Sequence, residues 1–259
     1  MHDIKAIFID FDGTLYSHVT NQIPKSTIKA LNKLHDKGIM SFLSTGRAPA
    51  EAGLFDMSKV KLEGKIFNNG QIIKNDKDEI IFSKPIEGRL KERIIELFNS
   101  HTLPVYLSTT GSVFINYVDK AAERVQMAVS SRLPYIKKYE GEDIFMASVY
   151  FDNPNTYNVI KDLEDIASIT SFFKGAYDIV PKGLSKQTGV EAICDLYNIT
   201  QQQTMAFGDG ENDLEMLEHC QIGVAMGNSI DSIKEIADYI TTDIDDDGIA
   251  NALKHYKLI

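Results

Sequence analysis

Long apolar runs are missing from this sequence of 259 residues, and no segment approaches the roughly 18 consecutive apolar residues that a membrane span requires. The first residues, MHDIKAIFID, carry acids where an export signal would have a basic region and then an uninterrupted apolar one. Only two cysteines occur, Cys194 and Cys220, and they form no CxxC pair. We therefore expect a cytoplasmic protein without membrane contacts or redox chemistry, whose two cysteines are small buried hydrophobes.

Basic residues are also in short supply, since 27 Lys and Arg stand against 37 Asp and Glu and the formal net charge is -10. Negative charge over most of the surface opposes a phosphate backbone, so nucleic acid is not an expected partner. A small phosphorylated metabolite is compatible with this charge, because a metal ion and a few cationic side chains can dominate a local site. The sequence carries no prediction of the oligomeric state.

Strand and helix patterns alternate in the first part of the chain. Residues 4–9 read as a buried strand, residues 23–38 place apolar side chains on one helical face, and IMSFLS is a second apolar strand pattern. Strand, helix and strand with short connections predict a parallel sheet, in which ligands bind at the carboxyl ends of the strands.

The same alternation resumes in the last third of the chain. A helix is predicted with Ser185 as its cap and with Val190, Ile193 and Leu196 facing inward. Strand patterns follow at TMAF, IGVAM and YITT, with helix patterns between and after them. The two ends of the chain therefore predict one sheet.

The middle of the chain does not show the regular strand–helix alternation. Its helix-like stretches are EGRLKERIIELFNSH and NTYNVIKDLEDIA, and its strand-like stretches are DIFMASVYF, ITSFFKG and YDIVP. Pro85 and Pro181 stand near the two crossings, as expected for segments that leave a sheet and return. We predict a doubly wound, mostly parallel Rossmann-like α/β core of residues 1–82 and 184–259. An α+β domain of residues 83–183 is inserted into it.

Polar residues fall at strand ends or helix starts of the predicted sheet. They are Asp10, Asp12, Thr45, Gly46, Lys186, Asp209, Asn212 and Asp213. Each group alone is typical of a solvated turn, a surface lysine or an acidic loop. In a doubly wound sheet they would meet in one crevice, where carboxylates can hold a divalent cation and a lysine and a hydroxyl can hold a dianion against it.

These motifs also match a known family in chain order. DFDGT has the form DxDxT, LSTGR ends a strand, Lys186 opens a helix and GDGEND follows a strand. Together they resemble the haloacid dehalogenase superfamily of phosphohydrolases. The position of the insert resembles that superfamily's larger, class IIB cap, and NNGQII and DDDGIANAL resemble its Cof-type branch. The resemblance covers the whole core, and covers the cap by position and rough pattern.

The resemblance implies Mg²⁺-dependent hydrolysis of a small phosphate monoester, such as a sugar phosphate or a phosphorylated cofactor. Asp10, Asp209 and the backbone carbonyl of Asp12 would bind the Mg²⁺ ion. Asp10 would be the nucleophile that forms an aspartyl-phosphate, and Asp12 would protonate the leaving oxygen and then activate water. For this task Asp12 must hold a proton near neutral pH, which neighbouring carboxylates would favour by raising its pKa and the Mg²⁺ ion would oppose.

The remaining residues are expected to bind the phosphoryl group. Thr45 and the Gly46 amide would contact its oxygens, Lys186 would balance its charge, and Asn212 would be a further phosphate or substrate contact. Asp213 would orient Lys186 or a metal-bound water.

Two interpretations of Arg47 stay open: a phosphate or substrate contact at the mouth of the crevice, or a surface salt bridge. The inserted domain would close over the crevice and contact the rest of the substrate. Candidate contacts in that domain, chosen by residue type alone, are Tyr117, Lys120 and Arg124.

Three other functions remain open at this point. A phosphotransferase of the phosphomutase kind uses the same aspartyl-phosphate, and the motifs do not reveal whether water is the acceptor. A phospho-receiver module also combines acids, a threonine and a lysine around Mg²⁺, but such modules lack an insert of this kind. A binding protein with an inactive site is disfavoured by the intact set of residues.

Overall fold

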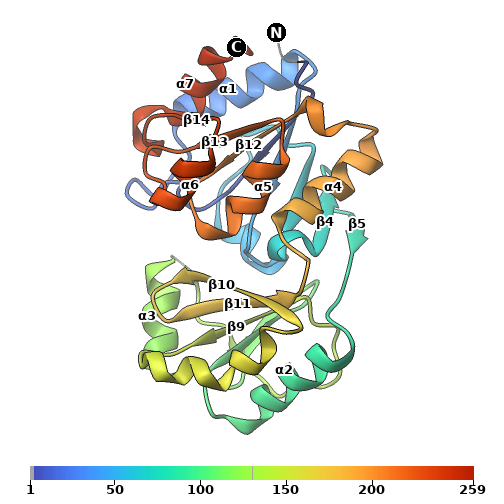
Figure 1. The fold of residues 1–259 in the computed structure, drawn as a ribbon, viewed down its shortest axis with the longest axis vertical. Helices are drawn as coiled ribbons and strands as arrows, with labels where there is room; N and C mark the ends of the chain where they lie inside the picture. Colours follow the sequence, from blue (N-terminus) through green and yellow to red (C-terminus); the bar gives the residue numbers. More distant parts are fainter. Residues whose placement is uncertain (1–2, 130) are drawn as a thin grey trace.

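The computed structural model describes residues 3–129 and 131–259. They form two sheets with attached helices, which lie one above the other along the long axis of the molecule (Figure 1). The larger sheet has eight strands, in the spatial order β14 (Tyr239–Ile240), β13 (Ile222–Ala225), β12 (Thr204–Gly208), β1 (Ala6–Ile9), β2 (Met40–Ser44), β3 (Gly64–Phe67), β4 (Ile72–Asn75) and β5 (Ile80–Ser83).

The larger sheet is parallel from β14 through β3, and β4 and β5 continue it as antiparallel strands. Its central strands are buried along their whole length, because helices cover both faces. One face carries α1 (Lys25–Asp36) and α7 (Gly248–His255). The other carries α4 (Lys186–Tyr197), α5 (Leu214–His219) and α6 (Asp231–Ile236). The predicted doubly wound core is confirmed.

The smaller sheet has six strands, in the spatial order β10 (Ala167–Phe173), β11 (Ala176–Pro181), β9 (Met146–Tyr150), β6 (Val105–Ser108), β7 (Val113–Ile115) and β8 (Tyr135–Ile136). It is antiparallel except for the parallel pair β7–β8. One face packs against α2 (Gly88–Ser100), and the other carries α3 (Lys120–Ala128). We call this sheet with α2 and α3 the cap.

The chain leaves the larger sheet after β5 and returns to it through α4, so the cap is an insertion (Figure 1). The backbone amide of Ile86 donates to the carbonyl of Ile144 at 2.7 Å, just beyond the first crossing. Pro181 ends β11 at the second crossing. The limits of the inserted domain, placed at residues 83 and 183 from the sequence, stay a prediction.

One predicted helix is wrong. The stretch NTYNVIKDLEDIA forms two short 3₁₀ segments, Pro154–Val159 and Lys161–Leu163, instead of an α-helix. Its Asn, Thr, Tyr, Val, Ile and Asp residues have weak helix propensity. Short turns are enough to bury the two apolar anchors, Ile160 and Leu163.

The start and the end of α4 also differ from the prediction. Ser185 occupies the cap position, but its side chain makes no capping bond, and the Thr188 hydroxyl instead accepts from the Ser185 amide at 3.3 Å. Val190 and Ile193 are buried as predicted, whereas Leu196 is 51% exposed. Leu196 lies roughly 240° around the helix from Val190, so it points away from the buried face.

Among the described residues, no helix is both long enough and apolar enough to cross a membrane. The cytoplasmic location stays a prediction. Cys194 and Cys220 are both buried and unbonded to each other, as predicted from their spacing.

We expect the two apolar positions of α4 to differ sharply in their effect on stability. Ile193→Ala removes a fully buried side chain and should lower the free energy of unfolding by about 2–5 kcal/mol. Leu196→Ala in the same helix should change it by less than about 0.5 kcal/mol. Urea denaturation of both variants checks this, and equal losses would contradict the exposed position of Leu196.

Candidate active site

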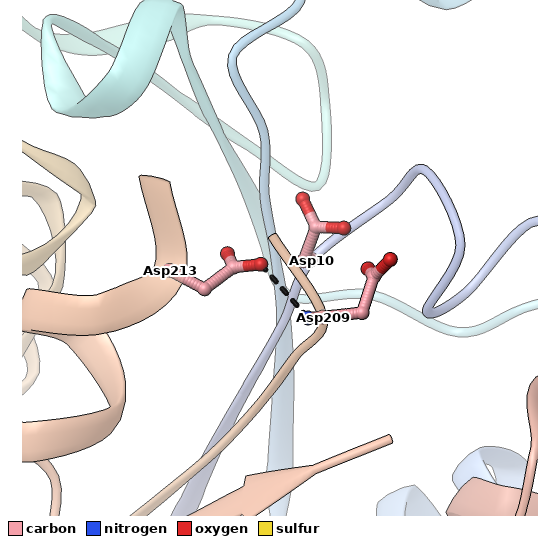
Figure 2. Close-up of side chains that lie close together, drawn as sticks. All are labelled: Asp10, Asp209 and Asp213. Carbon is pink, nitrogen blue, oxygen red and sulfur yellow. Dashed lines mark hydrogen bonds between the residues drawn. The ribbon is translucent and has the colours of Figure 1, made fainter. Parts of the chain in front are cut away.

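The predicted site residues meet at one edge of the larger sheet. Asp10, Thr45 and Asp209 directly follow the parallel neighbours β1, β2 and β12, respectively. Lys186 is the first residue of α4. Figure 2 shows the carboxyl groups of Asp10, Asp209 and Asp213 gathered beside the end of these strands. One oxygen from each of the three lies within 4.8 Å of the others.

Lys186 ties this cluster together from inside the protein. Its Nζ atom donates to Asp10 Oδ1 at 2.5 Å and to Asp213 Oδ1 at 2.6 Å, and the lysine side chain is 0% exposed. Burial alone would lower the pKa of Lys186, but the two carboxylates outweigh burial and raise it. The lysine therefore stays protonated at the pH of any ordinary assay.

Asp213 is engaged on both carboxyl oxygens. Oδ1 accepts from Lys186, and Oδ2 accepts from the backbone amides of Asp209 and Gly210 at 3.0 Å each. Figure 2 shows the bond between Asp213 and the Asp209 amide. The Asp213 carboxylate therefore binds both Lys186 and the turn after β12, and it holds the two in fixed relative positions. Asp10 differs, because no described residue donates to its Oδ2 atom, and it lines a cavity.

The three carboxylates share one buried ammonium group, so negative charge is in excess. Burial and the charge of Asp213 raise the pKa of Asp10 well above its ordinary value, although Lys186 opposes them. Burial and Asp213 also raise the pKa of Asp209, to about 7, against the hydrogen bond from Thr14. A divalent cation would relieve this repulsion, and the available hard oxygen atoms are the ligands that Mg²⁺ prefers.

Gly13 lets the DFDGT turn approach Asp209 closely. Its φ angle is +80°, and a Cβ atom at this position would lie 2.4 Å from Asp209 Oδ2. On the other side of the same turn, Thr14 Oγ1 donates to Asp209 Oδ1 at 2.7 Å. Asn228 Nδ2 donates to the Gly13 carbonyl at 2.8 Å. The turn and Asp209 therefore form one packed unit.

Asp12 points toward Arg47 and His18 instead of the other carboxylates. Arg47 holds it with two bonds, Nε to Oδ2 at 2.8 Å and Nη2 to Oδ1 at 2.6 Å, and His18 Nε2 lies 2.6 Å from Oδ1. Partial burial raises the pKa of Asp12, but His18 and Arg47 together outweigh burial and lower it. The expectation of a raised pKa is wrong for this arrangement, because Arg47 and His18 are hydrogen-bonded to the carboxylate.

Arg47 is buried, which excludes the surface salt bridge among its two interpretations. Its side chain is 9% exposed, and its guanidinium lies 4.5 Å from the ring centroid of Phe55. Besides binding Asp12, the guanidinium donates to the Val129 carbonyl of the segment after α3, at 2.6 Å. Arg47 therefore joins the DFDGT turn to the cap.

Gly46 faces two asparagine side chains. A Cβ atom on Gly46 would lie 3.1 Å from Asn69 Oδ1 and 3.4 Å from Asn212 Nδ2, and Asn212 donates to Asn69 at 3.1 Å. Asn69 comes from the NNGQ turn after β3 and also donates to Asp178 in the cap at 3.2 Å. Thr45 is buried next to this group, and its hydroxyl accepts from the Arg47 amide at 3.1 Å.

A cavity of about 600 Å³ lies between this cluster and the cap. Seven of the nine predicted residues line it, namely Asp10, Asp12, Gly46, Arg47, Asp209, Asn212 and Asp213. Thr45 and Lys186 are buried beside the lining residues. The sequence motifs therefore converge in space.

Several lining residues escaped the sequence analysis. Asn228 follows β13 closely, so the strand-end rule that selected Asp10 could also have found it. Asp178 interrupts the apolar strand β11, and a buried acid in such a strand is a usable signal. Asn69 lies against Gly46 outside the lining residues, and it belongs to NNGQII, a motif to which the sequence analysis assigned no task.

The three candidate substrate contacts in the cap do not line the cavity. Arg124 pairs with Asp152 at 2.7 Å and lies outside the cavity wall, while Tyr117 and Lys120 line a separate hollow. We chose these residues by type alone, and the sequence does not show which face of the cap sheet lies toward the core.

A parallel sheet that collects carboxylates at its strand ends beneath an inserted cap places this protein among the phosphoryl-transfer enzymes. It belongs to the haloacid dehalogenase-like hydrolases, whose family pattern matches residues 7–253, and it is a phosphatase of that family. The resemblance inferred from the motifs is thus confirmed. Because the protein is an enzyme of this family, it is neither a phospho-receiver module nor a binding protein with an inactive site.

Curated relatives cover nearly the whole chain. The putative phosphatase YkrA of Bacillus subtilis is 29% identical over 99% of both chains. The 5-amino-6-(5-phospho-D-ribitylamino)uracil phosphatase YitU of the same organism is 27% identical over 96% of both.

Solved structures agree with this result. The phosphatase BT1666 of Bacteroides thetaiotaomicron has a TM-score of 0.89 and 31% identity, over 100% of this chain and 97% of its own. The subclass IIB sugar phosphatase BT4131 has a TM-score of 0.87 and 30% identity, over 98% of this chain and 100% of its own. The predicted class IIB cap is confirmed by this similarity.

The raised pKa of Asp209 predicts a pH dependence of stability in the metal-free protein. Between its ordinary value of 3.8 and about 7, the folded chain binds a proton at Asp209 that the unfolded chain has released. The free energy of unfolding should therefore fall as the pH rises through this window. Added Mg²⁺ should raise Tm more at pH 8 than at pH 5, because protons compete with the ion.

Thermal melts of the wild type and Asp209→Asn, with EDTA or Mg²⁺, check this. The Tm of the wild type relative to the variant should decrease from pH 4.5 to 7.5. A rise over that range, or an equal Mg²⁺ effect in both proteins, would contradict the assignment.

Proposed function

We propose that this phosphatase hydrolyses a small phosphate monoester with the help of Mg²⁺, through an aspartyl-phosphate on Asp10. The observation that carries the proposal is the state of Asp10: one oxygen is held by Lys186, the other accepts no bond from the described chain, and the residue lines the cavity. A carboxylate held in this way is oriented for attack.

Asp10, Asp209 and the backbone carbonyl of Asp12 would hold the Mg²⁺ ion, which supplies the positive charge that lets a carboxylate approach a phosphate dianion. Asp213 remains outside this ligand set, because Lys186 and two backbone amides already engage its oxygens. It acts instead by positioning Lys186 and the turn that carries Asp209.

The reaction has two displacements. In the first, Asp10 attacks phosphorus, the ester P–O bond breaks, and the leaving oxygen takes a proton from Asp12. In the second, water attacks the phosphorus of the aspartyl-phosphate, gives its proton to Asp12 and releases inorganic phosphate, which restores Asp10.

Asp12 must move for this cycle to begin, because Arg47 and His18 stabilise its charged form. We infer that the substrate phosphate competes with the Asp12 carboxylate for the Arg47 guanidinium, since both the phosphate and the carboxylate are oxyanions that accept hydrogen bonds from the same pair of donors. Once released from Arg47, Asp12 lies among carboxylates that favour its protonated form. The same step brings Arg47 to the phosphate as a substrate contact.

The other predicted residues surround the transferring group. The Thr45 hydroxyl and the Gly46 amide would bind its oxygens, and Asn212 would contact it from the turn after β12. Lys186 would offset the charge that develops on the oxygens during transfer. These tasks follow from the positions of the side chains around one cavity.

The cavity is larger than a phosphate group needs, and its volume lies within the roughly 300–1,000 Å³ typical of small-molecule sites. YitU acts on a phosphorylated ribitylamino-uracil and BT4131 on sugar phosphates, according to their names. We infer a substrate of the same general kind, a small phosphorylated metabolite with a polar organic part.

Replacement of the nucleophile tests the proposal directly. Asp10→Asn should reduce release of phosphate from p-nitrophenyl phosphate to background while leaving Tm unchanged or higher, because one of the three crowded charges is removed. Asp36→Asn, an exposed acid of α1, is the matched control and should keep full activity. Substantial turnover by Asp10→Asn, or full wild-type activity in EDTA, would overturn the nucleophile or the metal assignment, respectively.

The acid–base role of Asp12 predicts a dependence on the leaving group. Asp12→Asn should lower kcat for an alkyl phosphate roughly 10²- to 10⁴-fold. The loss should be smaller for p-nitrophenyl phosphate, because p-nitrophenolate departs without needing a proton. Equal losses on both substrates would contradict proton donation by Asp12.

The acceptor of the phosphoryl group separates a hydrolase from a phosphotransferase. We expect inorganic phosphate to appear in step with the released alcohol when glucose is added as a competing acceptor. Formation of glucose phosphate in place of inorganic phosphate would favour the phosphotransferase.

A further inference from the structure

The cavity wall opposite Asp10 comes from one face of the cap sheet. Side chains alternate along its strands, so Tyr106, Ser148 and Asp178 line the cavity, while their neighbours Leu107 and Ile179 pack into the cap interior. Ser148 pairs directly with Asp178 on one side and with Tyr106 on the other. The three side chains therefore form one row across β11, β9 and β6.

Two carboxylates of this wall, Asp178 and Glu51, make no ion pair among the described residues, although the charge of Lys186 acts on Asp178 and that of Glu51 acts on Arg47. Asp178 accepts from Ser148 Oγ at 2.7 Å and from Asn69 Nδ2 at 3.2 Å. Glu51, from the core, accepts from the Tyr106 hydroxyl at 3.0 Å, from Ser131 Oγ at 2.6 Å and from the backbone amide of Ala48 at 2.9 Å. All five donors are neutral, so both acids leave negative charge on this wall of the cavity.

The pKa of Asp178 reflects that environment. Burial raises it to about 7, while the hydrogen bonds from Ser148 and Asn69 lower it and the charge of Glu51 raises it further. A ligand that donated hydrogen bonds here would stabilise the carboxylate, and a ligand with its own negative charge would be repelled.

Gln126 of α3 is a separate indication that this wall accepts a ligand, because its side-chain oxygen is buried without a hydrogen-bond donor. Its Nε2 atom donates to the Tyr150 hydroxyl at 3.0 Å, but its Oε1 atom has no partner among the described residues. The residue is only 4% exposed and lines the same cavity. A buried acceptor without a donor is unfavourable, and a hydroxyl or amine of a bound ligand would satisfy it.

The buried cationic groups of the site, Arg47 and Lys186, already bind other carboxylates. Arg47 binds Asp12, and Lys186 binds Asp10 and Asp213, all at the end where the phosphate would lie. Lys174 lines the cavity too, with an exposed side chain that water screens. The cavity thus combines cationic groups suited to a dianion with a wall of Asp178, Glu51 and Gln126 that offers acceptors and negative charge.

We propose that Asp178, Glu51 and Gln126 select phosphate monoesters whose leaving group is a hydrogen-bond donor without negative charge, that is, a neutral or amine-bearing polyol. Monoesters that carry a carboxylate or a second phosphate at the far end are excluded. This inference rests on the proposed phosphatase function and adds the chemical class of the leaving group.

A matched pair of substrates tests it. Sorbitol 6-phosphate and 6-phosphogluconate have the same carbon chain and differ at the far end, CH₂OH in one and a carboxylate in the other. At pH 8 the wild type should show a kcat/KM at least about tenfold higher for sorbitol 6-phosphate. If neither compound is turned over, each is tested as an inhibitor of p-nitrophenyl phosphate hydrolysis. Sorbitol 6-phosphate should then have an inhibition constant at least about tenfold lower than that of 6-phosphogluconate.

Variants assign the preference to residues. Asp178→Asn removes the charge with little change in shape and should reduce the ratio at least about fivefold. Gln126→Met should lower kcat/KM for sorbitol 6-phosphate about fivefold, the value of one neutral hydrogen bond. The control Asp162→Asn changes a cap acid that pairs with Arg93 outside the cavity, and it should leave the ratio unchanged.

Equal or faster use of 6-phosphogluconate by the wild type would overturn the inference. An unchanged ratio in Asp178→Asn together with unchanged kcat/KM in Gln126→Met would also overturn it. Absence of phosphate release from every compound, p-nitrophenyl phosphate included, would instead reject the proposed function itself.

Discussion

The crowding of buried carboxylates around Lys186 is the constraint on which the site depends. The lysine contacts Asp10 and Asp213 from the first turn of α4, so this helix, the end of β1 and the turn after β12 must keep their relative positions. One ammonium group does not balance three acids, and the remaining charge is what makes a divalent cation favourable here. Folding and the proposed chemistry therefore depend on the same interaction: the sheet brings the acids together, and in our proposal the shortage of positive charge attracts the cation that the reaction needs.

The core residues nearest the phosphate end of the cavity also hold the cap. Arg47 binds Asp12 and the Val129 carbonyl, and Asn69 lies against Gly46 while it donates to Asp178. Two neighbours of Asn69 extend this contact, since Asn68 accepts from Ser108 at 3.1 Å and Gln71 donates to the Phe145 carbonyl. Arg47 and Asn69 therefore each contact both the strand-end residues and the cap. In our proposal the substrate breaks the Arg47–Asp12 pair, and this would alter the cap contact at the same time.

The core of the site was predictable because the carboxyl ends of neighbouring parallel strands must meet. That rule placed Asp10, Thr45 and Asp209 together from the sequence, and it would have found Asn228 as well. The partners of Asp12 were not predictable, because they depend on how a long side chain 35 residues away is oriented. The cap contacts failed for a related reason: the sequence marks an acid within β11, but only the pairing of β11 with β9 shows that Asp178 and Ser148 share a face.

The alternation along the cap strands separates two tasks that are often entangled in enzymes. Leu107, Val149 and Ile179 keep the domain folded from one side of the sheet, while Tyr106, Ser148 and Asp178 look into the cavity from the other. Mutations of Ser148 and Asp178 change the polarity of the pocket without opening voids in the interior between the sheet and α2, whereas Tyr106 also packs in the hydrophobic cluster on the α3 side. Such a sheet can acquire a new substrate preference by point mutation at little expense in stability, so a lineage built on this scaffold is free to diversify its chemistry of recognition while the machinery below it stays constant.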